Sequence, residues 1–272
     1  MENKVRFVDT TLRDGAQSPG VAFTDAEQID IVRALDNCGI DIIEVGIPAM
    51  GLGEQNSILK MKEYFAHSKL LVWNRIVASD IEASIRCLPD IIHISLPVSE
   101  RQISYKLHKN YSQVKKMLQE CAYKAKCLGY PISIGFEDAS RANEIFLAEL
   151  LETLCEFEPL QIRYADTVGI LTPMQAYKNV ESLKNLCPFA IEFHGHNDLG
   201  FALANTVAAI QAGATIVDTT LLGLGERSGN CDFVKLVQVL QKMNGTSISF
   251  KEALIAQNIL KKYVSDEWGS LL

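Results

Sequence analysis

Two polar motifs in this chain contain residue types that could bind a metal ion and a substrate. In His194-Gly195-His196 the imidazoles are two residues apart, and on a β-strand residues i and i+2 face the same side. Two neutral imidazoles can bind one divalent cation, and Asp14, from the motif at 9–15, would add a carboxylate and leave positions open for a substrate. The other interpretation is that both histidines only form hydrogen bonds in a polar loop. The choice depends on whether the fold brings the two motifs together.

Short apolar runs alternate with amphipathic stretches along the chain. We expect eight strands, at 5–9, 42–46, 70–74, 91–96, 132–136, 161–165, 190–193 and 216–220. The first helix is expected at 25–38, where Thr24 and Glu27 have the spacing of a capping box, and Thr172-Pro173 begins a later helix. Eight alternating strand and helix units in about 240 residues predict an α/β fold, a (β/α)8 TIM barrel with parallel strands.

The expected barrel spans about residues 5–244, and its eighth helix lies at 233–243. A short appended C-terminal helix is expected at about 250–264. No Pro/Gly-rich or low-complexity linker interrupts residues 1–272, so we expect one catalytic domain. In such a barrel the active site lies at the C-terminal ends of the strands, which is where both polar motifs fall.

Glu44 is a charged residue within an otherwise apolar expected strand. A carboxylate at such a position needs a partner, and Arg13, just after the first strand, is the candidate. The pair could take part in catalysis or could be a buried ion pair with a structural role only. Other polar residues expected near the same strand ends are Gln17, Arg75, His93, Ser95, Glu137, Thr167 and Asn230. So many ionisable groups at one rim favour an enzyme.

The composition narrows the classes of function. The net charge is −7 and no Lys/Arg cluster stands out, so we expect no nucleic-acid and no membrane partner, while a local basic pocket for a phosphorylated cofactor stays possible. The apolar stretch at 201–225 contains Asn205, Gln211 and Asp218, which argues against a membrane span. The glycine-rich stretch at 223–230 lacks Gly-x-Gly-x-x-Gly spacing, which excludes a dinucleotide-binding fingerprint. Seven cysteines without a Cys-x-x-Cys pair, and an N-terminus without a signal-peptide pattern, indicate a cytoplasmic protein.

Six motifs, in order along the chain, resemble those of the metal-dependent acyl-CoA condensing and lyase barrels. This superfamily includes 2-isopropylmalate, homocitrate and citramalate synthases and 3-hydroxy-3-methylglutaryl-CoA (HMG-CoA) lyase. The motifs are Thr-Thr-Leu-Arg-Asp-Gly-Ala-Gln (10–17), Glu-Val-Gly-Ile-Pro-Ala-Met-Gly (44–51), Glu-Asp-Ala-Ser-Arg-Ala (137–142), Ala-Asp-Thr-Val-Gly (165–169), Glu-Phe-His-Gly-His-Asn-Asp-Leu-Gly (192–200) and Gly-Leu-Gly-Glu-Arg-Ser-Gly-Asn (223–230). The resemblance covers about residues 5–240 and is strongest to homocitrate synthase of the nitrogen-fixation type.

The resemblance implies roles for the residues that match these motifs. The divalent metal, Mg, Mn or Zn, would be bound by Asp14, His194 and His196, with Asn230 at or near it. The catalytic residues would be Arg13 over the keto oxygen of a 2-oxo acid, Glu44 holding it, and Glu137, which resembles a glutamate near the acetyl-CoA site. The substrate-binding residues would be Gln17, Arg75, His93, Ser95 and Thr167.

The implied reaction is a Claisen-type condensation of acetyl-CoA, as co-substrate, with 2-oxoglutarate to give homocitrate. The alternatives are another 2-oxo acid (pyruvate, oxaloacetate or 2-oxoisovalerate), cleavage like that of HMG-CoA lyase, or a metal-binding barrel without catalysis. Ala16 stands where the family often has glutamate, and no further region follows Leu272. We therefore expect a homodimer, or a hetero-oligomer in which another subunit supplies the C-terminal region of complete condensing enzymes.

Overall fold

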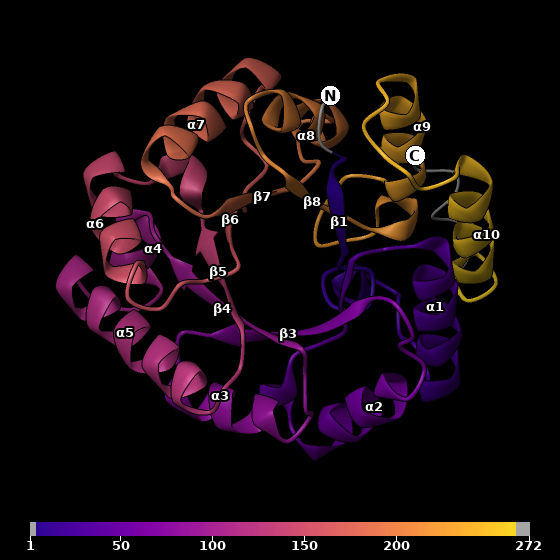
Figure 1. Cartoon of the computed structure of the whole chain (residues 1–272), viewed down its shortest axis with the longest axis horizontal. Helices are drawn as coiled ribbons and strands as arrows, with labels where there is room; N and C mark the ends of the chain where they lie inside the picture. Colours follow the sequence, from indigo (N-terminus) through magenta and orange to yellow (C-terminus); the bar gives the residue numbers. More distant parts are fainter. Residues whose placement is uncertain (1–3, 265–272) are drawn as a thin grey trace.

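The computed structural model describes residues 4–264, in which eight parallel strands close into a barrel in the order β1 to β8 (Figure 1). The strands are β1 (Arg6–Asp9), β2 (Ile42–Glu44), β3 (Lys69–Arg75), β4 (Ile91–Pro97), β5 (Ile132–Glu137), β6 (Gln161–Asp166), β7 (Ala190–Gly195) and β8 (Ile216–Thr219). The barrel closes where β8 pairs with β1, with Ile216 opposite Arg6. The predicted (β/α)8 TIM barrel is confirmed.

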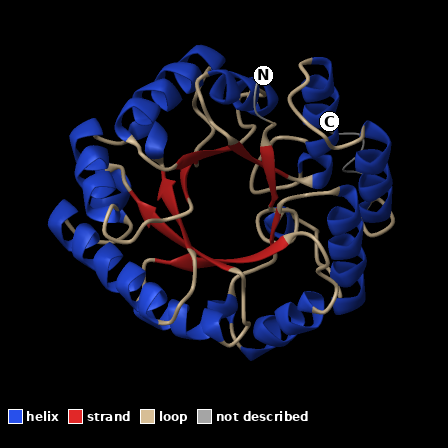
Figure 2. Ribbon diagram, viewed as in Figure 1, coloured by secondary structure: helices blue, strands red, loops and turns tan. Residues whose placement is uncertain are grey.

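Helices form a ring around the strands (Figure 2). They are α1 (Asp25–Cys38), α2 (Leu52–Lys62), α3 (Ala78–Ile85), α4 (Glu100–Tyr105), α5 (Tyr111–Cys127), α6 (Glu144–Leu154), α7 (Pro173–Leu186), α8 (Ala202–Gln211), α9 (Phe233–Lys242) and α10 (Phe250–Leu260). As predicted, α1 begins at a capping box of Thr24 and Glu27, and α7 begins at Pro173. Short 3-10 turns after β1, β2, β5 and β8 shape the C-terminal rim: η1 (Gly15–Gln17), η2 (Pro48–Met50), η3 (Ala139–Arg141) and η4 (Leu221–Gly223).

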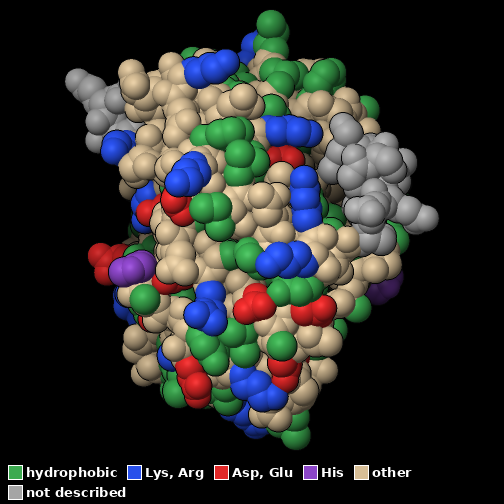
Figure 3. Space-filling view, turned by 90° about the vertical axis from the view of Figure 1, so that its right-hand side faces the viewer, with side chains coloured by type: hydrophobic (Ala, Val, Ile, Leu, Met, Phe, Trp, Pro, Cys, Tyr) green, Lys and Arg blue, Asp and Glu red, His purple; other side chains and the backbone are tan. Residues whose placement is uncertain are grey.

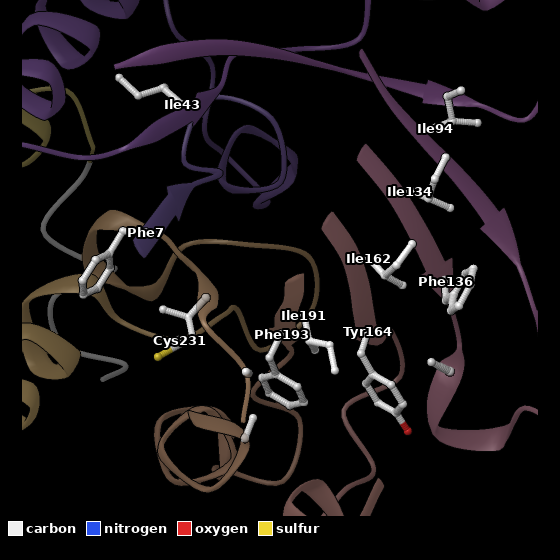
Figure 4. Packing of buried hydrophobic residues seen from close by; sticks show 14 of the residues in the cluster. Phe7, Ile43, Ile94, Ile134, Phe136, Ile162, Tyr164, Ile191, Phe193 and Cys231 are labelled. Carbon is white, nitrogen blue, oxygen red and sulfur yellow. The ribbon is translucent and has the colours of Figure 1, made fainter. Parts of the chain in front are cut away.

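The main hydrophobic core lies between the strands and the helices. Side chains alternate across a strand, so every second one points away from the barrel axis. Figure 4 shows residues of this layer, among them Phe7, Ile43, Ile94 and Ile134, all of which are buried. Burying one such side chain contributes about 1.5–3 kcal/mol, so this layer supplies most of the hydrophobic stabilisation.

The barrel interior has two layers of different chemistry. Near the N-terminal ends of the strands, inward side chains form a small apolar cluster of Val8, Ile42, Leu71, Ile91 and Ile216. Two residues further along a strand, the side chain again faces the barrel interior. At these positions β2, β4 and β8 carry Glu44, His93 and Asp218. The apolar layer closes the bottom, and the chemical groups are confined to the C-terminal half, as in other TIM barrels.

The C-terminal helix α10 extends the ring beside α1 (Figure 1). The buried residues of α10 are Ala253, Ala256, Gln257 and Leu260, and beyond the helix the Tyr263 hydroxyl donates a hydrogen bond to Asp30 of α1 at 2.7 Å. Figure 3 shows this side of the molecule, with Lys and Arg scattered among Asp, Glu and apolar side chains. Within residues 4–264, no helix combines the length and the apolar composition needed to cross a membrane.

Candidate metal centre and active site

A pocket opens at the C-terminal ends of the strands, where TIM barrels place their active sites. Its cavity of about 180 Å³ is smaller than the roughly 300–1,000 Å³ of pockets for drug-sized ligands, which suits a small acid. Eight of the predicted site residues line it: Arg13, Asp14, Gln17, Ser95, Glu137, Thr167, His194 and His196. The lining is completed by Ile47, Trp73, Lys106, Gly135, Arg163, Ala165 and Glu226. The two motifs at opposite ends of the chain therefore meet.

Three of these side chains form a cluster with the donor set of a divalent-metal site. Asp14 Oδ2 lies 3.6 Å from His194 Nε2 and 3.8 Å from His196 Nε2, and the two Nε2 atoms are 3.2 Å apart. Ligand atoms about 2.1 Å from one ion are about 3.0–3.4 Å from each other, so these separations are close to those of a bound set. The two-residue period at the end of β7 directs both imidazoles into the pocket, as the sequence predicts.

Both histidines are in the neutral form that metal binding requires. Burial lowers the pKa of His194 to about 4 and that of His196 to about 4. His194 Nδ1 is 2.9 Å from Asp218 Oδ2, so the ring proton lies on Nδ1 and the Nε2 lone pair faces the cluster. Burial opposes ionisation of Asp14, but Arg13 together with the other groups around the carboxyl outweighs it and holds the pKa of Asp14 below its usual value. The donor set therefore fits a divalent cation.

Asn230, from the loop after β8, lies beside Asp14. Its Nδ2 donates to Asp14 Oδ1 at 2.9 Å and to the carbonyl of Leu224 at 2.9 Å. Asn230 Oδ1 is buried and has no hydrogen-bond partner among the described residues, so it is a further oxygen available to an ion. A Cβ atom at Gly225 would collide with both Asn230 and Asp14, so the turn requires glycine. Asp14, His194, His196 and Asn230 are termed the metal side of the pocket.

Glu44 is buried and paired with two arginines. Its carboxylate accepts hydrogen bonds from Arg13, the predicted partner, and from Arg163 Nη2 at 2.6 Å. Burial by itself would raise the pKa of Glu44, but the two guanidinium groups hold it below its usual value. Arg13 also lies 3.0 Å from Asp14 Oδ2, and its guanidinium is 5.9 Å from the centre of the Trp73 ring. Glu44 thus fixes Arg13 beside the metal side, where it can donate to a substrate oxygen.

Sequence reasoning missed a second set of buried ionisable groups, which starts at Arg163 in the pocket lining and continues into the barrel. Arg163 Nε lies 2.6 Å from Glu192 Oε1 and 3.0 Å from Asp218 Oδ2. Burial raises the pKa of Glu192 well above its usual value and that of Asp218 to about 6. Asp218 therefore contacts both Arg163, which also binds Glu44, and His194 of the candidate metal site. Arg163, Glu192 and Asp218 are each an ionisable residue within an otherwise apolar strand, as Glu44 is. This pattern in the sequence could have identified them.

Ser95, Lys106 and Glu137 form the wall across the barrel from the metal side, and we term them the Glu137 side. Ser95 Oγ donates to Glu137 Oε1 at 2.8 Å, and Lys106 Nζ lies 3.0 Å from Glu137 Oε2. The Lys106 side chain, which follows α4, is 60% exposed, so this ion pair is in contact with solvent. Next to it, Thr167 Oγ1 accepts a hydrogen bond from the backbone N–H of Asp138 at 2.9 Å. Lys106 is a pocket residue that the sequence analysis did not single out.

Two of the predicted substrate-binding residues do not line the cavity. His93 is buried beneath it, with Nδ1 2.9 Å from Ser133 Oγ and with Nε2 unpartnered among the described residues. Arg75, at the end of β3, is held by Asp80 of α3 through contacts of 2.8 and 2.9 Å. Its guanidinium would have to leave Asp80 to reach a ligand in the pocket.

Fold and site define the chain as a TIM barrel with a candidate divalent-metal centre at its rim. The chain belongs to the HMGL-like family, whose model matches residues 4–261. It is 40% identical to homocitrate synthase subunit alpha of Clostridium pasteurianum over 267 residues, covering 97% of this chain and 99% of that protein. Identity to the homocitrate synthase of Frankia alni is 41% over 88% of this chain and 68% of that protein.

A solved structure shares the fold. The HMG-CoA lyase of Bacillus subtilis superimposes with a TM-score of 0.84 at 21% identity, covering 98% of this chain and 94% of that one. Together with the family match, this confirms the resemblance to the condensing and lyase barrels that six motifs predicted. The Asp14, His194 and His196 cluster is consistent with the divalent-metal site typical of the family.

Proposed function

We propose that this chain condenses acetyl-CoA with 2-oxoglutarate to give homocitrate and free CoA. The observation that carries the proposal is the meeting of Arg13 with Asp14, His194 and His196 in one small pocket. A 2-oxo acid can chelate an ion through its keto and carboxylate oxygens, and three protein donors leave coordination positions for it. The similarity to a homocitrate synthase alpha subunit over nearly its whole length supports 2-oxoglutarate as the acid.

The side chains of the pocket can carry out the steps of such a condensation. A divalent cation at the metal side would polarise the keto carbonyl as a Lewis acid. Arg13, fixed by Glu44, would donate hydrogen bonds to the oxygen on which negative charge develops. Glu137, oriented by Ser95 and Lys106, would accept a methyl proton of acetyl-CoA, and the resulting carbon nucleophile would add to the keto carbon. Water then hydrolyses the thioester and releases CoA as a thiol.

We further propose that the chain works as one subunit of a two-part enzyme. The similar Clostridium pasteurianum protein is named an alpha subunit and is matched over 99% of its length. The Glu137 side is open to solvent at Lys106, and a second polypeptide that covers this mouth would exclude water from the reacting groups.

The test is thiol release from acetyl-CoA by the purified, metal-loaded chain, alone and with the products of neighbouring genes. The acids are 2-oxoglutarate, pyruvate, oxaloacetate and 2-oxoisovalerate. We expect the fastest turnover with 2-oxoglutarate. A preference for another acid would keep the reaction class and change the substrate. Absence of thiol release with every acid and partner, with metal bound, would refute condensation, and cleavage of HMG-CoA by the same sample would replace it with lyase chemistry.

A further inference from the structure

One stretch of the chain departs from the overall acidic charge. Residues 101–116 contain five Lys or Arg side chains and no Asp or Glu, in a chain with a net charge of −7. The cations are Arg101, Lys106, Lys109, Lys115 and Lys116. Uncharged residues separate most of them, which is why the expectation of no Lys/Arg cluster overlooked this stretch. Its position in the fold shows what it can contact.

This stretch forms most of α4, the link after it and the start of α5, so it begins at the C-terminal rim beside the pocket. It follows β4 directly, and Lys106 reaches the cavity lining. The backbone N–H of Lys109 donates to the carbonyl of Ile103 at 3.1 Å, so the link after α4 folds back onto that helix. Ile103 is buried and anchors the turn, while Arg101 and Tyr105, four residues apart, lie on one face of α4 and are exposed.

The charges and the aromatic ring on this surface have few partners. Lys106 pairs with Glu137 and Lys116 with Glu120, whereas Arg101 and Lys109 form no ion pair with another described residue. Tyr105 is 80% exposed, more than any other large apolar side chain in residues 4–264. An exposed aromatic ring can stack on a nucleotide base, and nearby cations can bind its phosphates.

We propose that Arg101, Tyr105 and Lys109, termed the nucleotide surface, bind the 3′-phosphoadenosine diphosphate end of CoA. The choice of CoA rests on the proposed function, and the surface itself rests on the charges and exposure described above. CoA carries its pyrophosphate and 3′-phosphate at the end opposite its thiol, joined by the flexible pantetheine arm. Lys106, between the nucleotide surface and Glu137, marks the path of that arm into the pocket.

The surface can be tested without turnover by calorimetric titration of the full chain with CoA and with adenosine 3′,5′-bisphosphate, which lacks the pantetheine arm. Arg101→Ala combined with Lys109→Ala should weaken both affinities about tenfold, since it removes two charge contacts. Tyr105→Ala should also weaken them, and Tyr105→Phe should retain them because the ring still stacks. Lys69→Ala is the matched control: Lys69 is an exposed lysine at the start of β3, on the other end of the barrel, and its loss should change nothing.

A kinetic comparison connects the surface to the reaction. In the double variant the KM for acetyl-CoA should rise about tenfold, while the KM for S-acetylpantetheine, which has no phosphates, should stay unchanged. Equal binding by the double variant and the wild type would overturn the proposal, and so would an equal loss with both thioesters. Failure of the proposed function would give a different result. If nucleotide binding depended on Arg101 and Lys109 but no thiol were released, the nucleotide surface would be supported and the condensation reaction would be refuted.

Discussion

The two sides of the pocket are held in place in opposite ways. The four residues of the metal side are at most 5% exposed, Asn230 donates a hydrogen bond to Asp14, and His194 is hydrogen-bonded to Asp218. On the Glu137 side, Lys106 is 60% exposed and its ion pair with Glu137 faces solvent. The groups proposed to bind the metal and the 2-oxo acid are thus preorganised, whereas those proposed to face acetyl-CoA remain accessible.

This contrast predicts different costs for changes on the two sides. Removing one partner in a buried network leaves other polar groups unpaired, at about 1–3 kcal/mol for each neutral group and more for charges. Breaking an exposed ion pair usually costs about 0–1 kcal/mol, because water replaces the lost contact. Variants on the two sides can therefore test whether the contrast holds in the working protein.

His196→Ala should have the largest effect. It removes one of the two imidazoles of the metal side, and we expect the purified variant to lose bound metal and at least about a thousandfold in activity. Metal content after gel filtration and thiol release from acetyl-CoA are the measurements. His67→Ala is the control, because His67 is exposed and remote from the pocket. Full metal content and activity in His196→Ala would mean that the histidines only form hydrogen bonds.

Glu137→Gln should lower kcat by about 10²–10⁴-fold, because the amide cannot accept the methyl proton. Metal content should not change, since Glu137 lies outside the metal side. Lys106→Ala is the matched variant on the same ion pair, and it should cost only a few-fold because the pair is exposed. If both variants lost activity equally, the Glu137 side would be as tightly organised as the metal side.

Buried ionisable groups at the rim should also determine how the stability of the protein responds to pH. Asp9, buried at the end of β1, has its pKa raised by burial from the ordinary 3.8 to about 7. Between these values the unfolded chain releases this proton while the folded chain keeps it, so Asp9 should contribute a fall of a few kcal/mol to the free energy of unfolding as pH rises from 4 to 7. His194 and His196, whose pKa is lowered, contribute a rise over the same range, so the Asp9 contribution is read from the difference between a variant and the wild type. In urea unfolding across this range, the free energy of unfolding of Asp9→Asn should lack this falling contribution relative to the wild type, whereas the exposed control Glu149→Gln should follow the wild type. An unchanged slope in Asp9→Asn would mean that Asp9 is ionised in the folded protein.

Asp218→Asn should have a smaller effect than His196→Ala or Glu137→Gln. The side chain keeps its shape, but the charge that holds the Nδ1 proton of His194 is lost, and we expect metal affinity to fall about 10–100-fold. Competition with a chelator measures the affinity, and thermal unfolding of the metal-free variant separates this effect from damage to the fold. Unchanged affinity would show that Asp218 serves the buried network and does not orient His194.

Much of the barrel could be predicted because its signals are local. The apolar run at 132–136 became β5 and the capping residues at Thr24 and Glu27 started α1, since strand period and helix capping depend on near neighbours. The metal side was predictable for a related reason. His194 and His196 share one strand end, and the barrel places every strand end at one rim.

The remaining contacts depend on register and side-chain direction, which the sequence does not reveal. Arg163 reaches Glu44 across the barrel, from β6 to β2, and only the closed barrel shows that they face each other. Arg75 lies at the rim end of its strand as expected, but its guanidinium forms an ion pair with the nearby carboxylate of Asp80. Lys106 has a long flexible side chain, and its contact with Glu137 follows from where α4 lies.

The order of the metal side along the chain has a consequence for biosynthesis. Asp14 follows the first strand, whereas His194 and His196 lie at the end of the seventh strand and Asn230 follows the eighth. During translation, the first donor leaves the ribosome long before the others exist, so the nascent chain cannot assemble the site until nearly the whole barrel has been made. A metal ion bound at this site would then favour only the completed fold, and a chain interrupted before β7 would offer one carboxylate, which binds an ion weakly.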